Sequence, residues 1–135
     1  MRTSMLKCLR RSKNDFLVLT PSDRLTEVEE VVRLIRNLLP IRMEVLAHEA
    51  GSPEENTYGW EGYARIDEGV AKIFLSSKDP QEIAALLLHE IGHLLGLPHC
   101  RDPKCVMRDS LWEEGKGLWI CRRCREKFLS AIGGD

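Results

Sequence analysis

The segment from residue 89 to residue 99, HEIGHLLGLPH, constrains this chain more than any other part of it. His89 and His93 are four residues apart, so on a helix their imidazoles lie about one turn apart on the same face and can both reach one metal ion. Glu90 projects beside this pair, where its carboxylate can hydrogen-bond a reacting water without binding the metal itself. The pattern favours an active-site helix that carries two metal ligands and a general base.

The end of this helix supplies a third candidate ligand. Gly96 tolerates the left-handed backbone of a helix C-terminus, and Pro98 forbids helical continuation. The chain can therefore fold back and bring His99 to the same ion, with a fourth coordination position left open. The alternative is an amphipathic core helix whose histidines are only satisfied polar groups. A chance occurrence of the defining residues at these spacings is on the order of 10⁻⁵, which favours the metal site.

A second cluster of candidate ligands begins directly after the third histidine. It consists of two pairs of cysteines: Cys100 and Cys105, then Cys121 and Cys124. Four thiolates suit a closed tetrahedral zinc site with a structural role, because no coordination position remains for a substrate. The alternative is disulfides or a redox-active Cys-x-x-Cys. The metal is favoured because the sequence shows no export signal, and reducing compartments keep thiols reduced.

The histidine segment resembles the zinc signature HExxHxxGxxH of the metzincin metalloproteases. Including the cysteines and Met107 that follow, residues from about 79 to 128 are similar to the archaemetzincins, a branch of that family. The resemblance implies two Zn²⁺ ions per chain, one catalytic and one structural. The residues that match the catalytic zinc ligands are His89, His93 and His99. The residues that match the structural zinc ligands are Cys100, Cys105, Cys121 and Cys124. Glu90 matches the base, Gly96 the turning glycine, and Met107 the methionine beneath the catalytic metal.

The rest of the chain predicts an α+β fold. Short or alternating apolar runs predict strands at 16–20 and 41–47 and a hairpin of strands at 58–66 and 70–76. Apolar spacings of three and four predict a backing helix at 23–39, and Asp79 is a good N-cap for the active-site helix. We expect a metzincin-like mixed twisted sheet of about four strands with these two helices. A small irregular C-terminal zinc-binding subdomain with a terminal helix would follow.

A length of 135 residues fits one catalytic domain. We expect a leader at 1–14, an N-terminal subdomain with the sheet and the active-site helix at 15–96, and a C-terminal subdomain at 97–135. The last would contain the Met-turn and the four-cysteine zinc site. Cys8 in the leader is either an inert buried thiol or a thiolate that caps the catalytic zinc, as in latent metzincins.

The predicted function is zinc-dependent peptide hydrolysis by a metallopeptidase, with zinc-activated water and Glu90 as general base. The resemblance implies that a peptide or protein substrate adds as a strand along the sheet edge near 70–76. Two alternatives stay open. One is a non-catalytic zinc-binding module that binds a protein or nucleic-acid partner through its basic C-terminal side chains. The other is a metzincin relic that binds zinc without turnover.

Charge and hydropathy limit the expected partners. The 20 basic and 21 acidic residues give a net charge of −1, so we expect no nucleic-acid partner. No apolar run approaches the roughly 18 residues of a membrane-spanning helix, and the first residues lack the apolar stretch of a secretory signal. We therefore expect a cytoplasmic monomer that does not associate with membranes.

Overall fold

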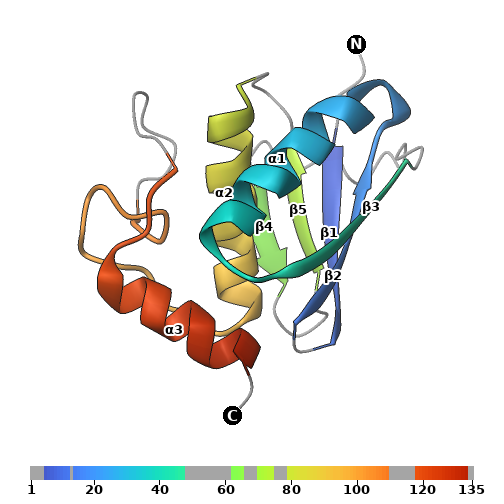
Figure 1. The fold of residues 1–135 in the computed structure, drawn as a ribbon. Coiled ribbons are helices and arrows are strands. Elements are labelled where there is room, and N and C mark those ends of the chain that lie inside the picture. The colour runs from blue at the N-terminus through green and yellow to red at the C-terminus, as the bar shows by residue number, and fades with distance from the viewer. Residues whose placement is uncertain are drawn as a thin grey trace.

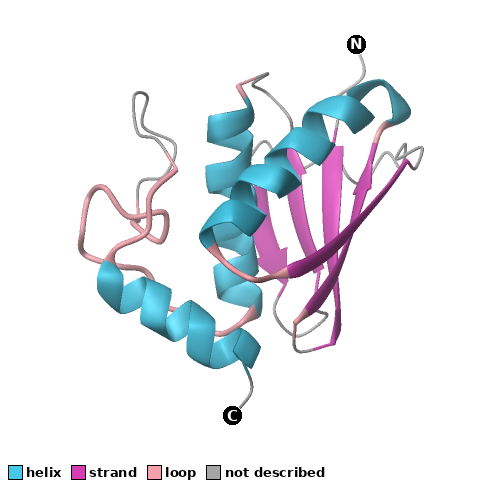
Figure 2. Cartoon of the chain, in the orientation of Figure 1, coloured by secondary structure: helices cyan, strands magenta, loops and turns pink. Residues whose placement is uncertain are grey.

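The computed structural model describes residues 5–12, 14–47, 62–65, 70–74, 79–109 and 118–133. Within these residues, five strands form one mixed sheet with the order β3-β2-β1-β5-β4. The strands are β1 (Met5–Ser12), β2 (Asp15–Thr20), β3 (Arg42–Ala47), β4 (Gly62–Arg65) and β5 (Val70–Phe74). The helices are η1, a 3-10 turn (Ser22–Arg24), α1 (Leu25–Leu38), α2 (Pro80–Leu94) and α3 (Arg122–Gly133), as Figures 1 and 2 show.

Antiparallel pairing dominates the sheet, and one parallel pair makes it mixed. β1 pairs antiparallel with β2 and with β5, and β5 pairs antiparallel with β4. β2 and β3 run parallel and are joined through α1, as a parallel pair requires a crossover. The strands and backing helix predicted from periodicity are confirmed wherever the structure describes them. The predicted hairpin turn at 67–69 lies outside the described residues.

The helices α1 and α2 cover the same face of the sheet (Figure 1). Alternate strand residues face them, and Cys8, Phe16 and Val18 are fully buried. α1 contributes a buried stripe of Val28, Val31, Val32 and Ile35. α2 is buried at every residue from 83 to 92, so the candidate ligands on this helix are carried by an element that its surroundings hold in place.

The strand β1 corrects the prediction of a leader at 1–14. Met5–Ser12 lies in the middle of the sheet, between β2 and β5. Leu6 and Cys8 are fully buried and alternate with the half-buried Lys7 and Leu9, which is the pattern of a strand. Because this strand is added, the described sheet has five strands rather than about four. The division of the remaining chain at residue 96 stays a prediction.

The sheet edges also differ from the prediction. β5 pairs on both sides, with β1 and β4, so the segment near 70–76 is not an edge strand and its free pairing with a peptide was a wrong expectation. The outer strands of the described sheet are β3 and β4. Of these two, β4 packs against α2.

Both ends of α2 are held by specific hydrogen bonds. Asp79 is the N-cap, and its Oδ1 accepts from the N–H of Gln81 at 3.0 Å, while Pro80 occupies the first helical position. At the other end, Arg10 of β1 donates to the carbonyl oxygen of Leu94 at 2.9 Å. This satisfies one of the carbonyls that a helix C-terminus leaves without a partner.

α3 is the predicted terminal helix, and it packs against the rest of the molecule. Its Phe128 is fully buried, and its Arg125 donates to the carbonyl oxygen of Leu38 at the end of α1. No helix in the described ranges is both long and apolar enough to cross a membrane.

Candidate metal centres

Three imidazoles converge at the C-terminal end of α2. His89 and His93 belong to the helix, and His99 belongs to the chain that follows it. Nε2 of His93 lies 3.1 Å from Nε2 of His89 and 3.1 Å from Nε2 of His99. One ring nitrogen from each residue lies within 4.8 Å of the others. The structure thus brings together the three side chains whose spacing predicts a shared metal site.

The outer nitrogens of the two helical histidines contact backbone carbonyls. Nδ1 of His89 lies 2.6 Å from the carbonyl oxygen of Val106, and Nδ1 of His93 lies 3.1 Å from that of Leu97. A carbonyl oxygen only accepts hydrogen bonds, so each Nδ1 carries a proton and donates. When these rings are neutral, each Nε2 therefore bears a lone pair.

The third histidine is oriented by a side chain instead. Nδ1 of His99 lies 2.5 Å from Oδ1 of Asp109. A carboxylate also only accepts, so Nδ1 donates here too, and a neutral His99 presents its Nε2 lone pair to the same point as the other two rings.

The electrostatics of the histidine cluster fit a metal cation. Burial first, and then the neighbouring imidazoles and Arg108, lower the pKa of His89 to about 4 despite its hydrogen bond to Val106. Burial also lowers the pKa of His93. Neutral rings then hold Nε2 lone pairs 3.1 Å apart with no proton between them, which is repulsive. A cation at their meeting point removes this repulsion, and imidazole nitrogens are common ligands of Zn²⁺.

Glu90 is buried next in sequence to the first of these histidines. Its side chain is 3% exposed, and its Oε1 is buried without a hydrogen-bond partner in the described part of the chain. Burial raises the pKa of this carboxyl to about 7. A buried polar atom without a partner is unusual and points to a functional contact. A carboxyl with a pKa near neutrality suits a group that takes up and releases a proton.

The turn after α2 depends on one glycine. Gly96 has a φ of 92°, the left-handed conformation that residues with a Cβ adopt at a cost. The N–H of Gly96 donates to the carbonyl of His93 at 3.0 Å, and the N–H of Leu97 donates to that of Gly92 at 2.8 Å. These bonds close the helix end and direct the chain back toward the site, where His99 follows Pro98.

Met107 packs against α2 because of a second glycine. Met107 is fully buried. A Cβ placed on Gly92 would lie 2.5 Å from Sδ and 2.8 Å from Cε of Met107, and 3.1 Å from Cζ of Phe128. The missing side chain therefore lets Met107 and α3 approach the helix between its two histidines.

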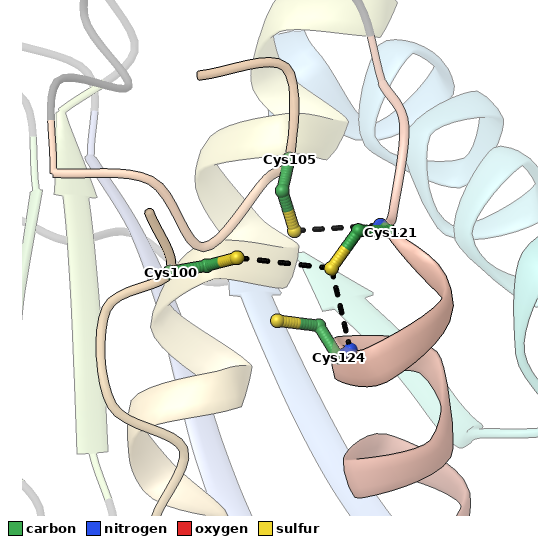
Figure 3. Close-up of side chains that lie close together, drawn as sticks. All are labelled: Cys100, Cys105, Cys121 and Cys124. Atoms are coloured by element: carbon green, nitrogen blue, oxygen red, sulfur yellow. Dashed lines mark hydrogen bonds between the residues drawn. The ribbon is translucent and has the colours of Figure 1, made fainter. Parts of the chain in front are cut away.

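The four cysteines expected to bind a second metal point toward one another (Figure 3). Two come from the chain that follows α2 and two from the N-terminal end of α3. Their Sγ atoms all lie within 4.8 Å of one another, and those of Cys100 and Cys121 are 3.7 Å apart. A disulfide would need about 2.05 Å, and every described cysteine is free. Four convergent sulfurs fit a closed tetrahedral Zn²⁺ site.

Backbone N–H groups donate to three of these sulfurs. The N–H of Asp102 donates to Cys100 Sγ at 3.4 Å, that of Cys121 to Cys105 Sγ at 3.5 Å, and that of Cys124 to Cys121 Sγ at 3.4 Å. Burial opposes ionisation of Cys121, but the N–H of Cys124 and the neighbouring thiols outweigh it and lower the pKa of Cys121. Such donors stabilise the thiolate, which is the form that binds metal.

One short segment serves both clusters. Cys105 supplies a thiol to the second cluster. The next residue, Val106, supplies the carbonyl that His89 contacts, and Asp109 supplies the carboxylate that His99 contacts. The geometry of the histidine cluster is therefore tied to a segment that begins at one of the four clustered cysteines.

Cys8 lies apart from both clusters. It is fully buried in β1, and burial raises the pKa of its thiol. It does not belong to either group of converging ligand atoms among the described residues. The structure supports the inert buried thiol and not the zinc-capping thiolate.

Sequence analysis missed three residues that shape these centres. Asp109 orients a candidate ligand, Gly92 admits Met107, and Arg10 holds the end of α2. Gly92 has the clearest signal, because a glycine inside a buried helix indicates a close approach. The contacts of Asp109 and Arg10 depend on tertiary structure, and no local sequence pattern predicts them.

The fold resembles that of a zinc-dependent peptidase. The crystal structure of a zinc-dependent peptidase from Methanocorpusculum labreanum superposes with a TM-score of 0.61, at 17% sequence identity, over 83% of this chain and 98% of that one. This similarity establishes that the two chains share an α+β fold.

The sequence comparisons are more specific than the comparison of folds. Residues 81–129 match the family model for peptidase family M54. An archaemetzincin from Pyrobaculum aerophilum is 46% identical over 49 residues, which are 34% of this chain and 32% of that protein. An archaemetzincin from Sulfolobus acidocaldarius is 34% identical over 75 residues, 53% of this chain and 42% of that protein. The matches thus span less than half the length of these curated relatives. Together they show that part of this chain is similar to peptidase family M54 and to archaemetzincins, which confirms the predicted resemblance.

Proposed function

We propose that this chain is a zinc-dependent metallopeptidase that hydrolyses peptide bonds with Glu90 as general base. The observation that carries the proposal is the convergence of three Nε2 atoms whose opposite ring nitrogens are all engaged with acceptors. The ligands of the catalytic zinc would be His89, His93 and His99. Three histidines leave the fourth position of a tetrahedral zinc free, which distinguishes a catalytic site from a structural one.

Zinc bound at this centre would supply a Lewis acid and a water of lowered pKa. The remaining chemistry falls to the protein. Glu90 would take the proton of the attacking water and later deliver it to the leaving amine. Its buried Oε1, which has no partner among the described residues, is the atom we assign to that proton. The buried setting would keep the carboxyl in the range where it can both accept and release a proton near neutral pH.

A second, structural zinc would be held by the four cysteines, giving two ions per chain. The ligands are Cys100, Cys105, Cys121 and Cys124. Their donor set leaves no open position, so this ion would stabilise the C-terminal segment rather than take part in the reaction. Gly96 and Met107 would support the first centre by turning the chain and by packing beneath the helix.

The substrate would be a peptide or protein in extended form. The edge of the described sheet nearest α2 is β4 (Gly62–Arg65), which replaces the edge expected near 70–76. A peptide could add to this edge through backbone hydrogen bonds. The monomeric state, the cytoplasmic location and the absence of nucleic-acid and membrane partners stay predictions.

The test compares the parent with Glu90→Gln on a peptide library, while bound zinc is counted in both proteins. The amide keeps the shape of the side chain but cannot take the proton, so we expect two zinc ions per chain and a loss of turnover of about 10²–10⁴-fold. Glu30→Gln is the matched control, because Glu30 is an exposed carboxylate on α1 that pairs with Arg33. Parental cleavage by Glu90→Gln would refute the general base. Zinc binding without cleavage by the parent would instead favour the non-catalytic module.

A further inference from the structure

The three histidines are not oriented in the same way. His89 and His93 sit on a buried helix, and backbone carbonyls hold their Nδ1 atoms. His99 lies beyond the helix end with its side chain 46% exposed, and its Nδ1 contacts the carboxylate of Asp109 at 2.5 Å. The ring with the least packing around it therefore depends on a side chain, which a substitution can remove.

The backbone places this carboxylate beside His99. The chain at Cys100 and Arg108 forms a parallel bridge, and the N–H of Cys100 donates to the carbonyl of Met107 at 2.7 Å. The bridge holds the segment of His99 against the segment of Asp109, and in its parallel register these two residues lie diagonally across it. Arg108 is itself buried and donates to the carbonyl of Cys105 at 3.0 Å. The backbone of the segment that carries Asp109 is thus held by the fold, while the Asp109 side chain itself is 81% exposed.

We propose that Asp109 is a positioning residue that orients His99 and raises the affinity of the histidine centre for its metal. The inference rests on the proposed metal site at the three histidines, but not on turnover. A carboxylate that accepts from Nδ1 fixes the tautomer with Nε2 bare, restricts rotation of the ring and increases the basicity of Nε2. Because the Nδ1 atoms of the other two rings contact backbone carbonyls, Asp109 is a contact through which a substitution can tune this centre.

The test measures zinc affinity of the histidine centre by competition with a chelator, without any substrate. Asp109→Ala should weaken zinc binding at this centre about 10–100-fold, the usual effect of removing a residue that orients a metal ligand. Asp109→Asn keeps an oxygen acceptor but loses the charge, so its affinity should fall between those of the parent and Asp109→Ala. The thiolate centre, followed separately through the charge-transfer absorption of bound Co²⁺, should be unchanged in both variants. Glu126→Gln is the charge-matched control, because Glu126 is exposed and pairs with Arg122.

A double-mutant cycle separates positioning of His99 from a general effect on the fold. When His99 is already removed in His99→Ala, the further change Asp109→Ala should weaken zinc binding no more. Parental affinity in Asp109→Ala overturns the proposal. So does an equal loss at both centres, an equal effect of Asp109→Ala with and without His99, or an affinity of Asp109→Asn below that of Asp109→Ala. None of these outcomes depends on peptide cleavage. The role of Asp109 can therefore be refuted while the proposed peptidase function stands, and the peptidase function can be refuted while the role of Asp109 stands.

Discussion

The two ligand clusters meet at adjacent residues, His99 and Cys100, yet they are built in opposite ways. Two of the three histidines sit on α2, a helix buried along most of its length. The four cysteines come from irregular chain and from the N-terminal end of α3, and they are joined mainly by contacts among themselves and nearby backbone. Packing organises the first cluster. Although Cys105, Cys121 and Cys124 are also buried, we expect the second cluster to owe much of its order to the metal that we propose it binds.

This difference sets a direction of dependence between the centres. The segment that supplies Val106 and Asp109 to the histidines is anchored by Cys105. Loss of order at the thiolates should therefore loosen the histidine centre. Loss of a histidine should leave the thiolates in place, because the hydrogen bonds of the four sulfurs among the described residues involve thiols and backbone N–H groups.

The largest predicted effect follows from removing one ligand of each cluster in turn. Cys124→Ser should lower the zinc content of both centres and reduce the free energy of unfolding by about 4 kcal/mol or more, the range reached when a structural metal is lost. His93→Ala should empty only the histidine centre. Zinc counting and thermal unfolding of the two variants measure both effects.

Binding of the two ions can be thermodynamically linked. If one ion strengthens binding of the other, the second must strengthen the first by the same factor. The four-thiolate centre should nevertheless stay filled in His93→Ala, because we expect its zinc affinity to be much higher than that of the histidine centre. A thiolate centre that empties in His93→Ala would reverse the proposed order of dependence.

The next effect comes from Gly92, where α2, the methionine turn and α3 meet. Gly92→Ala places a Cβ 2.5 Å from Sδ of the buried Met107, so the two must separate. We expect a loss of about 1–3 kcal/mol of unfolding free energy from overpacking, with weaker zinc binding at the histidines. Gly133→Ala is the control, because an added Cβ there meets nothing within 4 Å. Chemical denaturation measures the stability of both variants. Equal stability would mean that Met107 is not packed tightly against α2 at Gly92.

The sequence predicted the histidine cluster well because its determinants are local. Helical spacing places His89 and His93 on one face, and Gly96 followed by Pro98 can only end the helix. Local patterns also predicted α1 and β3, from the periodicity of their apolar residues, and β2, from a short apolar run. The general base and the ligand roles themselves stay proposals, because geometry alone does not test chemistry.

The central strand β1 could not be predicted because its signals are tertiary. β1 contains Lys7, Arg10 and Arg11, and these residues hid the alternation of its buried side chains. Arg10 holds the end of α2, and Arg11 pairs with Asp15 and Glu44. An arginine in a central strand is acceptable when its guanidinium reaches a carbonyl or carboxylate, and no sequence window contains that information.

A smaller loss of unfolding free energy is expected on substitution of Gly96, where only the backbone conformation is affected. An added Cβ meets nothing within 4 Å, but φ is 92°. Gly96→Ala should therefore lose about 1–2 kcal/mol through backbone strain. Gly96→Asn should lose less, because asparagine tolerates the left-handed conformation better. Denaturation curves of both variants provide the measurement, and equal losses would argue against strain as the cause.

The smallest effect concerns the cysteine that belongs to neither cluster, and it appears only at alkaline pH. Burial raises the pKa of Cys8 above its ordinary value of 9.0, so the folded protein keeps this thiol neutral while the unfolded chain ionises it. The stabilisation is fully present below about pH 9 and is lost as the pH rises further, at up to about 1.4 kcal/mol per pH unit. Between pH 8 and pH 10.5, the free energy of unfolding of the parent should therefore fall more steeply than that of Cys8→Ala. In the native, zinc-loaded protein Cys8 should also resist iodoacetamide, since the thiolate is the reactive form. Parallel pH profiles, or rapid alkylation of Cys8 before unfolding, would place this thiol at an accessible site and reopen the capping role that its burial in β1 argues against.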